Sequence, residues 1–190
     1  MRVKKIALFA SGSGTNAQNI IEYFSENKNV MVDSVWTNKP DAFVLERAKK
    51  HNIESFVFTK DEFRNTNKVV DSLKNRGVDL IVLAGFLWLI PNNLIQKFRI
   101  INIHPALLPK YGGKGMYGIN VHRSVVDNKD KESGITIHYV NEKYDDGEII
   151  FQAKCAVLPT DTTDDVATKV HQLEYIYFPE VIEKVLKDEL

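Results

Sequence analysis

The sequence has little cysteine and no long apolar run. Cys155 is the one cysteine among 190 residues, so no disulfide can form within the chain. No stretch of the sequence approaches the about 20 consecutive apolar residues of a membrane-spanning helix. The apolar part of the N-terminal segment is too short for a signal peptide. These absences favour a cytoplasmic protein that does not act at a membrane.

An excess of charge of one sign is also absent. Lys and Arg number 25 and Asp and Glu number 25, which argues against a nucleic-acid partner that needs a broad basic surface. The sequence lacks the Cys-x-x-Cys and His-Glu-x-x-His spacings of metal sites, so we expect no metal. Cys155 lies in an apolar-rich run without a positively charged or helix-start setting. We therefore expect a buried or half-buried strand residue there rather than a nucleophile.

The composition is that of a globular domain, with 44% hydrophobic and 26% charged residues. The length favours one domain that spans residues 1–190. In the first half, apolar strand-like runs at 3–9, 30–36, 52–58, 78–84 and 100–103 alternate with helical patterns around 20–24, 41–51, 65–76 and 91–98. This alternation predicts a mainly parallel, twisted sheet with helices on both faces.

The second half has a different pattern. A helix is expected at 121–128, followed by paired antiparallel strands at 134–140 and 148–158 around a turn at 145–147. A long terminal helix is expected at 164–186, with Pro179 as a kink or a break. The prediction is therefore an α/β domain with an antiparallel C-terminal strand pair.

The most informative motif is Asn102-Ile103-His104-Pro105, at the end of an expected strand. Residues two apart on a strand point to the same side, so Asn102 and His104 would face one space. An amide that donates hydrogen bonds, beside a group that titrates near neutral pH, can handle a carbonyl that passes through a tetrahedral state. The alternative is structural, because Asn and His often satisfy buried backbone groups at strand ends.

A glycine-rich loop, residues 11–16 (Ser-Gly-Ser-Gly-Thr-Asn), joins the first strand to a helix. Its glycines let the backbone approach a ligand, and the helix start supplies free N–H groups, so the loop could cradle a phosphate. It is neither a dinucleotide fingerprint nor a Walker A loop. The alternative is a tight turn with Thr15 as the helix cap.

Two further segments are candidates for the same edge of the sheet. The apolar run 85–90 could form a wall for a flat heteroaromatic ring, or simply continue the core. The turn at Tyr144-Asp145-Asp146-Gly147 could be structural. However, a carboxylate near His104 would raise the pKa of the imidazole and hold it protonated.

The remaining candidates are a loop and three histidines. Residues 110–118 form a glycine-rich loop that suits an active-site flap or a subunit contact better than a phosphate site. His122 lies on an expected helix and His171 on the terminal helix. His138 alternates with Thr136 along a strand and could line the same cavity as His104.

Together these segments resemble the glycinamide ribonucleotide transformylase family, the folate-dependent formyltransferases of purine biosynthesis. The motifs that carry the resemblance are Ser-Gly-x-Gly-[Ser/Thr]-Asn at 11–16, the segments 34–42, 83–86 and 102–111, and Asp145-x-Gly147. They follow one another in order over essentially the whole chain. The resemblance implies a Rossmann-like formyltransferase fold. It also implies a phosphate-substrate half at 1–103 and a folate-binding and catalytic-loop half at 104–190.

The resemblance implies a transfer of the formyl group of 10-formyltetrahydrofolate to the amine of 5'-phosphoribosylglycinamide, in a monomer or homodimer without a metal. The catalytic residues would be Asn102, His104 and Asp145, with Asp145 keeping His104 charged. The residues expected to bind the ribonucleotide are Gly12, Ser13, Gly14, Thr15, Asn16, His171 and Glu174. Those expected to bind the folate are Arg64, Leu87, Trp88, Leu89, Ile90, Asn102 and Asn141.

The sequence departs from relatives at three places. Trp88 stands where relatives commonly carry a smaller or basic residue, the stretch 112–120 is longer than in many of them, and Arg64 is only near the place of an arginine that meets the folate tail. The rival functions are a formyltetrahydrofolate hydrolase, a methionyl-tRNA formyltransferase and a non-catalytic phosphate-binding module. The tRNA enzyme carries a further C-terminal domain that this sequence lacks, and the binding module would not need Asn102, His104 and Asp145 to meet.

Overall fold

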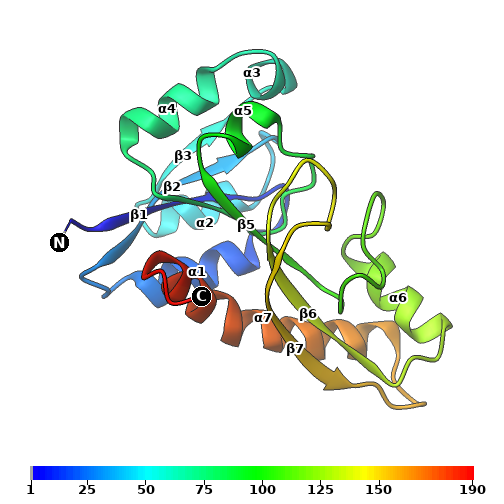
Figure 1. Cartoon of the computed structure of the whole chain (residues 1–190). Coiled ribbons are helices and arrows are strands. Elements are labelled where there is room, and N and C mark those ends of the chain that lie inside the picture. The colour runs from blue at the N-terminus through cyan, green and yellow to red at the C-terminus, as the bar shows by residue number, and fades with distance from the viewer. Residues whose placement is uncertain (1) are drawn as a thin grey trace.

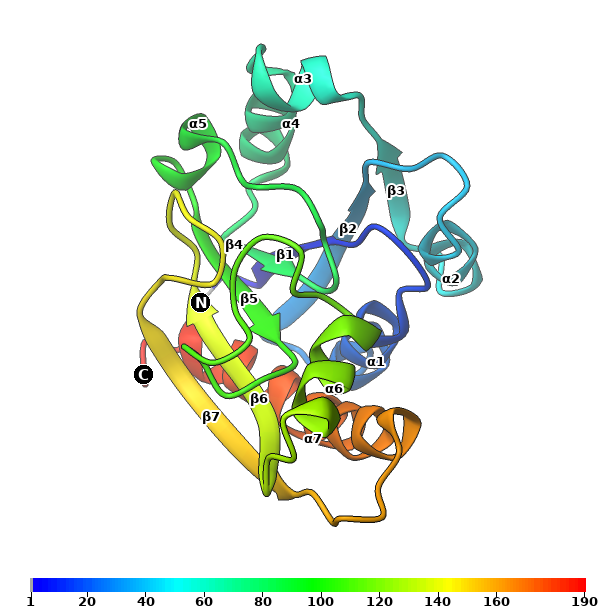
Figure 2. The same ribbon diagram turned by 90° about the vertical axis from the view of Figure 1, so that its right-hand side faces the viewer.

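A computed structural model describes residues 2–190, whose strands form one mixed sheet (Figure 1). The seven strands lie in the order β3-β2-β1-β4-β5-β6-β7, with β5, β6 and β7 paired antiparallel and the other pairs parallel. Figure 2 shows β6 and β7 side by side at one edge of the sheet and β3 at the opposite edge. This architecture confirms the α/β fold expected from the alternating pattern.

The elements follow closely from the apolar periodicity. In chain order they are β1 (Lys4–Phe9), α1 (Thr15–Phe24), β2 (Val30–Thr37), α2 (Val44–Lys50), β3 (Glu54–Val57), α3 (Lys60–Arg64), α4 (Lys68–Arg76), β4 (Leu80–Leu83), α5 (Asn92–Ile95), β5 (Arg99–His104), α6 (Ile119–Asp127), β6 (Glu132–Tyr139), β7 (Ile149–Ala156) and α7 (Thr163–Leu186). Half-buried Cys155 lies on β7, as expected.

The two faces of the sheet bury separate apolar clusters. Along β1, Ile6 and Leu8 contact the cluster that α1, α2 and α7 cover, whereas Ala7 and Phe9 contact the cluster under α3, α4 and α5. Figure 1 shows these two helical layers on opposite sides of the sheet. The alternation of neighbours follows from the two-residue period of a strand. A parallel strand that is covered on both faces therefore appears in the sequence as a continuous apolar run.

Two expected helices begin later than predicted, and one helix was not predicted. The helix expected at 41–51 begins at Val44, and the helix expected at 65–76 begins at Lys68. The short helix α3 was not expected at all. Its start is marked by a capping box, in which Thr59 accepts a hydrogen bond from the Glu62 N–H and Glu62 accepts one from the Thr59 N–H. That Thr-x-x-Glu spacing is the signal in the sequence that could have located it.

Pro179 does not break α7, which continues through it. Proline lacks an N–H group, so it removes the helical hydrogen bond to the carbonyl of residue 175. In this structure Asn19 of α1 donates its side-chain amide to the Tyr175 carbonyl at 2.9 Å. The neighbouring helix thus replaces the bond that proline removes.

Of the residues that the structure describes, 2–190, none forms a helix with both the length and the apolar content to cross a membrane.

Candidate active site

The site lies at the carboxyl ends of β1, β4 and β5, where the strand order reverses between β1 and β4. At such a reversal, the loops that follow the two strands diverge to opposite faces and leave a crevice. The crevice here is a cavity of about 650 Å³. Its lining comprises residues 11–16, 84–87, 102–105, 113–118 and 144–145, with Lys39, His122, His171 and Glu174. The glycine-rich loop 11–16 and the Asn-x-His strand end therefore share one cavity.

Asn102, His104 and Asp145 meet in this cavity. Asn102 and His104 both line it, which agrees with the two-residue spacing on β5. The Nδ1 atom of His104 lies 3.5 Å from Oδ1 of Asp145, although the residues are far apart in the sequence. The His104 side chain is only 4% exposed. The arrangement places an amide, an imidazole and a carboxylate around one space.

Asp145 is held by its backbone and by the loop that follows β5. Its φ of 52° is left-handed, a conformation that an aspartate adopts uncommonly. A Cβ atom on Gly147 would overlap the carbonyl of Tyr139, so this turn requires glycine there. The Gly113 N–H donates to Asp145 Oδ2 at 2.9 Å. Although burial raises the pKa of Asp145, its contacts with His138, His104 and the Gly113 N–H outweigh burial and lower that pKa below its ordinary value. Asp145 is thus a carboxylate at neutral pH.

The charge state expected for His104 is wrong. Burial is the largest influence on this ring and lowers its pKa. The negative charge of Asp145 and a hydrogen bond to the Tyr111 carbonyl raise the pKa, but they do not overcome burial. The pKa of His104 therefore lies below its ordinary value, and the free protein holds His104 neutral at pH 7.

His138 belongs to the same cluster. It pairs directly with Asn102 across β5 and β6, and its Nε2 lies 3.1 Å from Asn102 Nδ2 and 3.7 Å from Asp145 Oδ1. Its Nδ1 lies 2.8 Å from the Tyr139 carbonyl, which can only accept, so neutral His138 carries its proton on Nδ1. The free Nε2 then accepts a hydrogen bond from the Asn102 amide. The alternation of Thr136 and His138 along the strand was the signal in the sequence that placed His138 near the cavity. The sequence did not indicate the register that brings His138 opposite Asn102.

Loop 11–16 is shaped to bring backbone N–H groups to the cavity. Gly14, rather than Thr15, caps α1, and it has a φ of 72°. The first-turn N–H groups of a helix have no partner inside the helix, and their partial positive charge favours an anion. The Val44 N–H donates to the Gly12 carbonyl at 3.1 Å, and Arg47 Nε donates to the Ser13 carbonyl at 2.7 Å. These bonds turn the carbonyls of the loop toward α2.

A Gly14→Ala substitution is expected to weaken phosphate binding. A Cβ atom at Gly14 would lie 2.6 Å from Val44 Cβ, and alanine is strained at this φ. Strain of about 1–3 kcal/mol should displace the loop and raise the KM for a phosphorylated substrate about tenfold. Steady-state kinetics measure this change. Gly77→Ala is the matched control, because Gly77 has a similar φ of 70° but ends α4 and does not line the cavity. An equal rise of KM in both variants would contradict the loop geometry.

Glu174 and His171 of α7 also line the cavity. Glu174 is 5% exposed and accepts a hydrogen bond from Asn16 Nδ2 at 2.9 Å. Burial raises the pKa of Glu174, while Asn16 and His171 oppose that shift. This buried acceptor beside loop 11–16 suits a hydroxyl group of a ligand.

His122 of α6 contacts His171, with ring centroids 6.1 Å apart. His122 is 2% exposed, and its Nδ1 has no hydrogen-bond partner. Burial is the main influence that lowers the pKa of His122 to about 4, and His171 and His104 add to it. His122 is consequently neutral over the whole physiological range.

This lowered pKa predicts a loss of stability in acid. An unfolded histidine has a pKa of about 6.5, so below that pH the unfolded state binds a proton that folded His122 does not. The free energy of unfolding should fall by about 2–3 kcal/mol from this residue as the pH falls from 7 to 4.5. Urea unfolding at both pH values measures it. The His122→Gln variant should lose less stability over this range. Equal losses in the two proteins would contradict the buried neutral histidine.

The residues expected on the folate side separate into two groups. Leu87 lines the main cavity, and Trp88, Leu89 and Ile90 line an adjoining one of about 60 Å³, together with Asn102, His138, Val140 and Asp145. The Trp88 ring has an aromatic wall behind it, since Phe63 lies 5.9 Å and Phe58 6.2 Å away between ring centroids. Arg64 and Asn141 line neither of these cavities.

Residues 2–190 contain no group of three His, Cys, Asp or Glu side chains that could hold a metal ion.

Known proteins with similar sequences and structures share one activity in their names. The formyl transferase family matches residues 4–182. The chloroplastic phosphoribosylglycinamide formyltransferase of Arabidopsis thaliana is 41% identical, over 100% of this chain and 68% of that protein. The phosphoribosylglycinamide formyltransferase of Haemophilus influenzae is 39% identical, over 95% of this chain and 86% of that protein. Glycinamide ribonucleotide transformylase 1 from Symbiobacterium toebii superposes with a TM-score of 0.86 at 32% identity, over 95% of this chain and 86% of that one. These matches confirm the resemblance found in the sequence motifs.

Proposed function

The chain belongs to the formyl transferase family, and we propose that it transfers the formyl group of 10-formyltetrahydrofolate to the amine of 5'-phosphoribosylglycinamide. The products are 5'-phosphoribosyl-N-formylglycinamide and tetrahydrofolate, in de novo purine (IMP) biosynthesis. One observation carries the proposal. A single cavity is lined both by loop 11–16 and by Asn102, His104 and Asp145. A substrate with a phosphate and an amine at opposite ends fits that layout.

Loop 11–16 would bind the phosphate through its backbone N–H groups and the start of α1. Glu174, which faces the same cavity, would accept hydrogen bonds from the ribose hydroxyls, and His171 lies one helical turn before it. With the phosphate held at loop 11–16, the amine end extends toward His104. Binding at the phosphate end would in this way orient the nucleophile.

The wall 87–90 would receive the folate. Trp88 and Ile90 offer an apolar face, and Asn102 and Asp145 border the same small cavity with polar groups. An apolar slot with a few convergent polar groups fits a flat heteroaromatic ring. The folate supplies a formyl group that is already activated on its N10 nitrogen. Arg64 remains a candidate for the folate tail and Asn141 a candidate folate contact, although neither lines the cavities that hold the reacting groups.

Three side chains would carry the chemistry. As the amine nitrogen bonds to the formyl carbon, the formyl oxygen gains negative charge. Asn102 donates a hydrogen bond to this oxygen through the Nδ2 hydrogen that does not bond to His138. Neutral His104 takes the proton that the amine loses. Asp145, 3.5 Å away, stabilises the imidazolium so formed. His104 then delivers the proton to N10 as the bond between N10 and the formyl carbon breaks. Asp145 thus stabilises a transient charge instead of maintaining a permanent one.

We further propose the division of the chain into a phosphate-substrate half at 1–103 and a folate-binding and catalytic-loop half at 104–190. The protein would act in the cytoplasm, as a monomer or homodimer, on its two small-molecule substrates.

The proposal is tested by following tetrahydrofolate formation from 10-formyltetrahydrofolate, with and without 5'-phosphoribosylglycinamide. We expect turnover that depends on the amine, and a large loss when the dephosphorylated ribosylglycinamide replaces the ribonucleotide. Deformylation that ignores the amine would identify a hydrolase. Binding of the ribonucleotide without any folate turnover would identify a phosphate-binding module.

A further inference from the structure

The backbone carbonyl of Tyr111 determines which nitrogen of His104 carries the proton. His104 Nε2 lies 2.7 Å from this carbonyl. A carbonyl oxygen can only accept a hydrogen bond, so neutral His104 carries its proton on Nε2. Nδ1 is then the free nitrogen, and it is the one that faces Asp145 at 3.5 Å. A proton taken up in the reaction therefore arrives at Nδ1.

The Tyr111 carbonyl reaches this place through a strained backbone. Tyr111 has a φ of 56°, which is uncommon for a bulky residue. Residues in such conformations persist where surrounding contacts over-determine them. The bond to His104 is one of these contacts. Further contacts are needed to hold the Tyr111 backbone, because the His104 ring gains and loses a proton during the proposed reaction.

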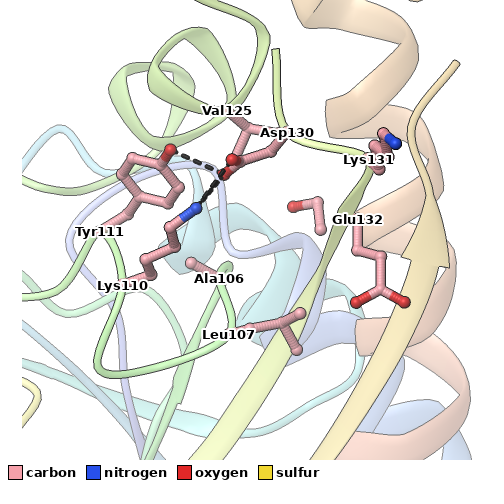
Figure 3. A pocket seen from close by; sticks show the side chains of 9 residues that line it. Ala106, Leu107, Lys110, Tyr111, Val125, Asp130, Lys131 and Glu132 are labelled. Atoms are coloured by element: carbon pink, nitrogen blue, oxygen red, sulfur yellow. Dashed lines mark hydrogen bonds and ion pairs between the residues drawn. The ribbon is translucent and has the colours of Figure 1, made fainter. Parts of the chain in front are cut away.

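A set of three side chains, here called the Tyr111 clamp, supplies the other contacts. Tyr111 Oη donates to Asp130 Oδ2 at 2.7 Å, and Lys110 Nζ lies 2.7 Å from Oδ1 and 2.9 Å from Oδ2 of the same carboxylate. Figure 3 shows both side chains directed at Asp130. Asp130 follows α6, so the clamp ties the loop after β5 to the connection between α6 and β6.

We propose that Tyr111, Asp130 and Lys110 are positioning residues that keep His104 in the Nε2–H tautomer, with Nδ1 free toward Asp145. They do not touch the reacting atoms. The three clamp residues line a separate cavity of about 470 Å³ (Figure 3), and none of them lines the cavity of Asn102, His104 and Asp145. The effect on turnover rests on the proposed formyl transfer, whereas the effect on the tautomer does not.

The hydrogen bond from Nε2 to the Tyr111 carbonyl also affects the pKa of His104. Burial lowers the pKa of His104, and the hydrogen bond to the Tyr111 carbonyl opposes that effect. Of the neighbouring side chains, Asp145 raises the pKa of His104 and His138 lowers it. If the carbonyl shifts, the pKa of His104 should fall further, and the acid limb of the pH profile should move to lower pH.

The first test is nuclear magnetic resonance of the protein labelled with ¹⁵N-histidine, in the absence of substrates. The wild-type protein should show His104 with a protonated Nε2 and an unprotonated Nδ1, assigned with the His104→Gln variant. In Tyr111→Phe and Asp130→Asn, both ring nitrogens should move toward averaged shifts of two exchanging tautomers. Asp130→Glu keeps the carboxylate and should restore part of the wild-type spectrum.

The second test is kinetic. Tyr111→Phe and Asp130→Asn should each lower kcat about tenfold, as expected for loss of a hydrogen bond to a charged group, with little change in the KM for the ribonucleotide. The matched control is Tyr177→Phe, because Tyr177 is a half-buried tyrosine of α7 that contacts Phe151. It should leave the spectrum and the kinetics unchanged.

The outcomes separate the two proposals. Wild-type ¹⁵N shifts of His104 in both clamp variants, with kcat unchanged, would overturn the positioning role while formyl transfer stands. A wild-type protein without formyl transfer would overturn the proposed function alone, because the resonance comparison needs no substrate.

Discussion

The His104→Ala variant is expected to lower kcat by about 10²- to 10⁴-fold, the range of a lost general acid–base. The ring is the group that lies beside Asp145 at 3.5 Å with a free Nδ1, so its removal leaves the amine without a proton acceptor. The loss should appear in kcat at saturating concentrations of both substrates. The KM for the ribonucleotide should change little, because loop 11–16 and Glu174, rather than His104, are the groups proposed to bind it.

The fold of this variant must be checked, because His104 is buried and bonded to Tyr111. Circular dichroism and thermal unfolding provide that control. His51→Ala, at the end of α2, is a matched histidine variant outside the cavity and should keep wild-type turnover. Turnover near the wild-type value in folded His104→Ala would remove His104 from the mechanism.

The Asn102→Ala variant should lower kcat by about 10²- to 10³-fold, as for removal of one donor from an oxyanion site. Its Nδ2 group contacts His138 with one proton, and the second would face the formyl oxygen as negative charge develops. The effect should be on kcat rather than on the KM for the folate, because the bond strengthens as the carbonyl carbon becomes tetrahedral. Steady-state kinetics with varied folate separate the two parameters.

Asn93→Ala is the control for the amide substitution. The Asn93 amide donates to the Thr66 carbonyl at 3.2 Å on the α5 side of the sheet, and Asn93 lines neither catalytic cavity. A raised KM for the folate with an unchanged kcat in Asn102→Ala would contradict the oxyanion role and leave Asn102 as a binding residue.

Local sequence patterns were enough to predict the helices and strands and about half of the candidate site. The alternating apolar runs predicted a doubly covered sheet, because a parallel strand is buried on both faces. The spacing of Asn102 and His104 predicted a shared side, since the period of a strand is two residues. The glycines of loop 11–16 predicted a strand-to-helix turn, and Gly14 has the positive φ that such a turn requires.

The other half of the site depends on contacts between distant segments. The antiparallel register of β5 and β6 pairs Asn102 with His138. This register cannot be predicted from the sequence of either strand alone. The Tyr111 carbonyl is a backbone group, so no side-chain motif marks it. The resemblance to relatives supplied Asp145, but its distance from His104 came from the fold.

The charge of His104 shows why residue types alone mislead. A neighbouring carboxylate predicts a protonated imidazole, and that carboxylate is present. Burial of the ring has the opposite and larger effect, and its extent depends on the packing of the loops around the cavity. His104 is therefore neutral in the free protein.

The central claim is that this cavity moves a formyl group from the folate to the amine of the ribonucleotide. The direct measurement uses 10-formyltetrahydrofolate with ¹³C in the formyl group, together with the wild-type protein and 5'-phosphoribosylglycinamide, and follows the label by mass spectrometry. We expect the label in 5'-phosphoribosyl-N-formylglycinamide, in equal amount to the tetrahydrofolate formed. Label that accumulates as free formate, at a rate independent of the amine, would contradict the claim.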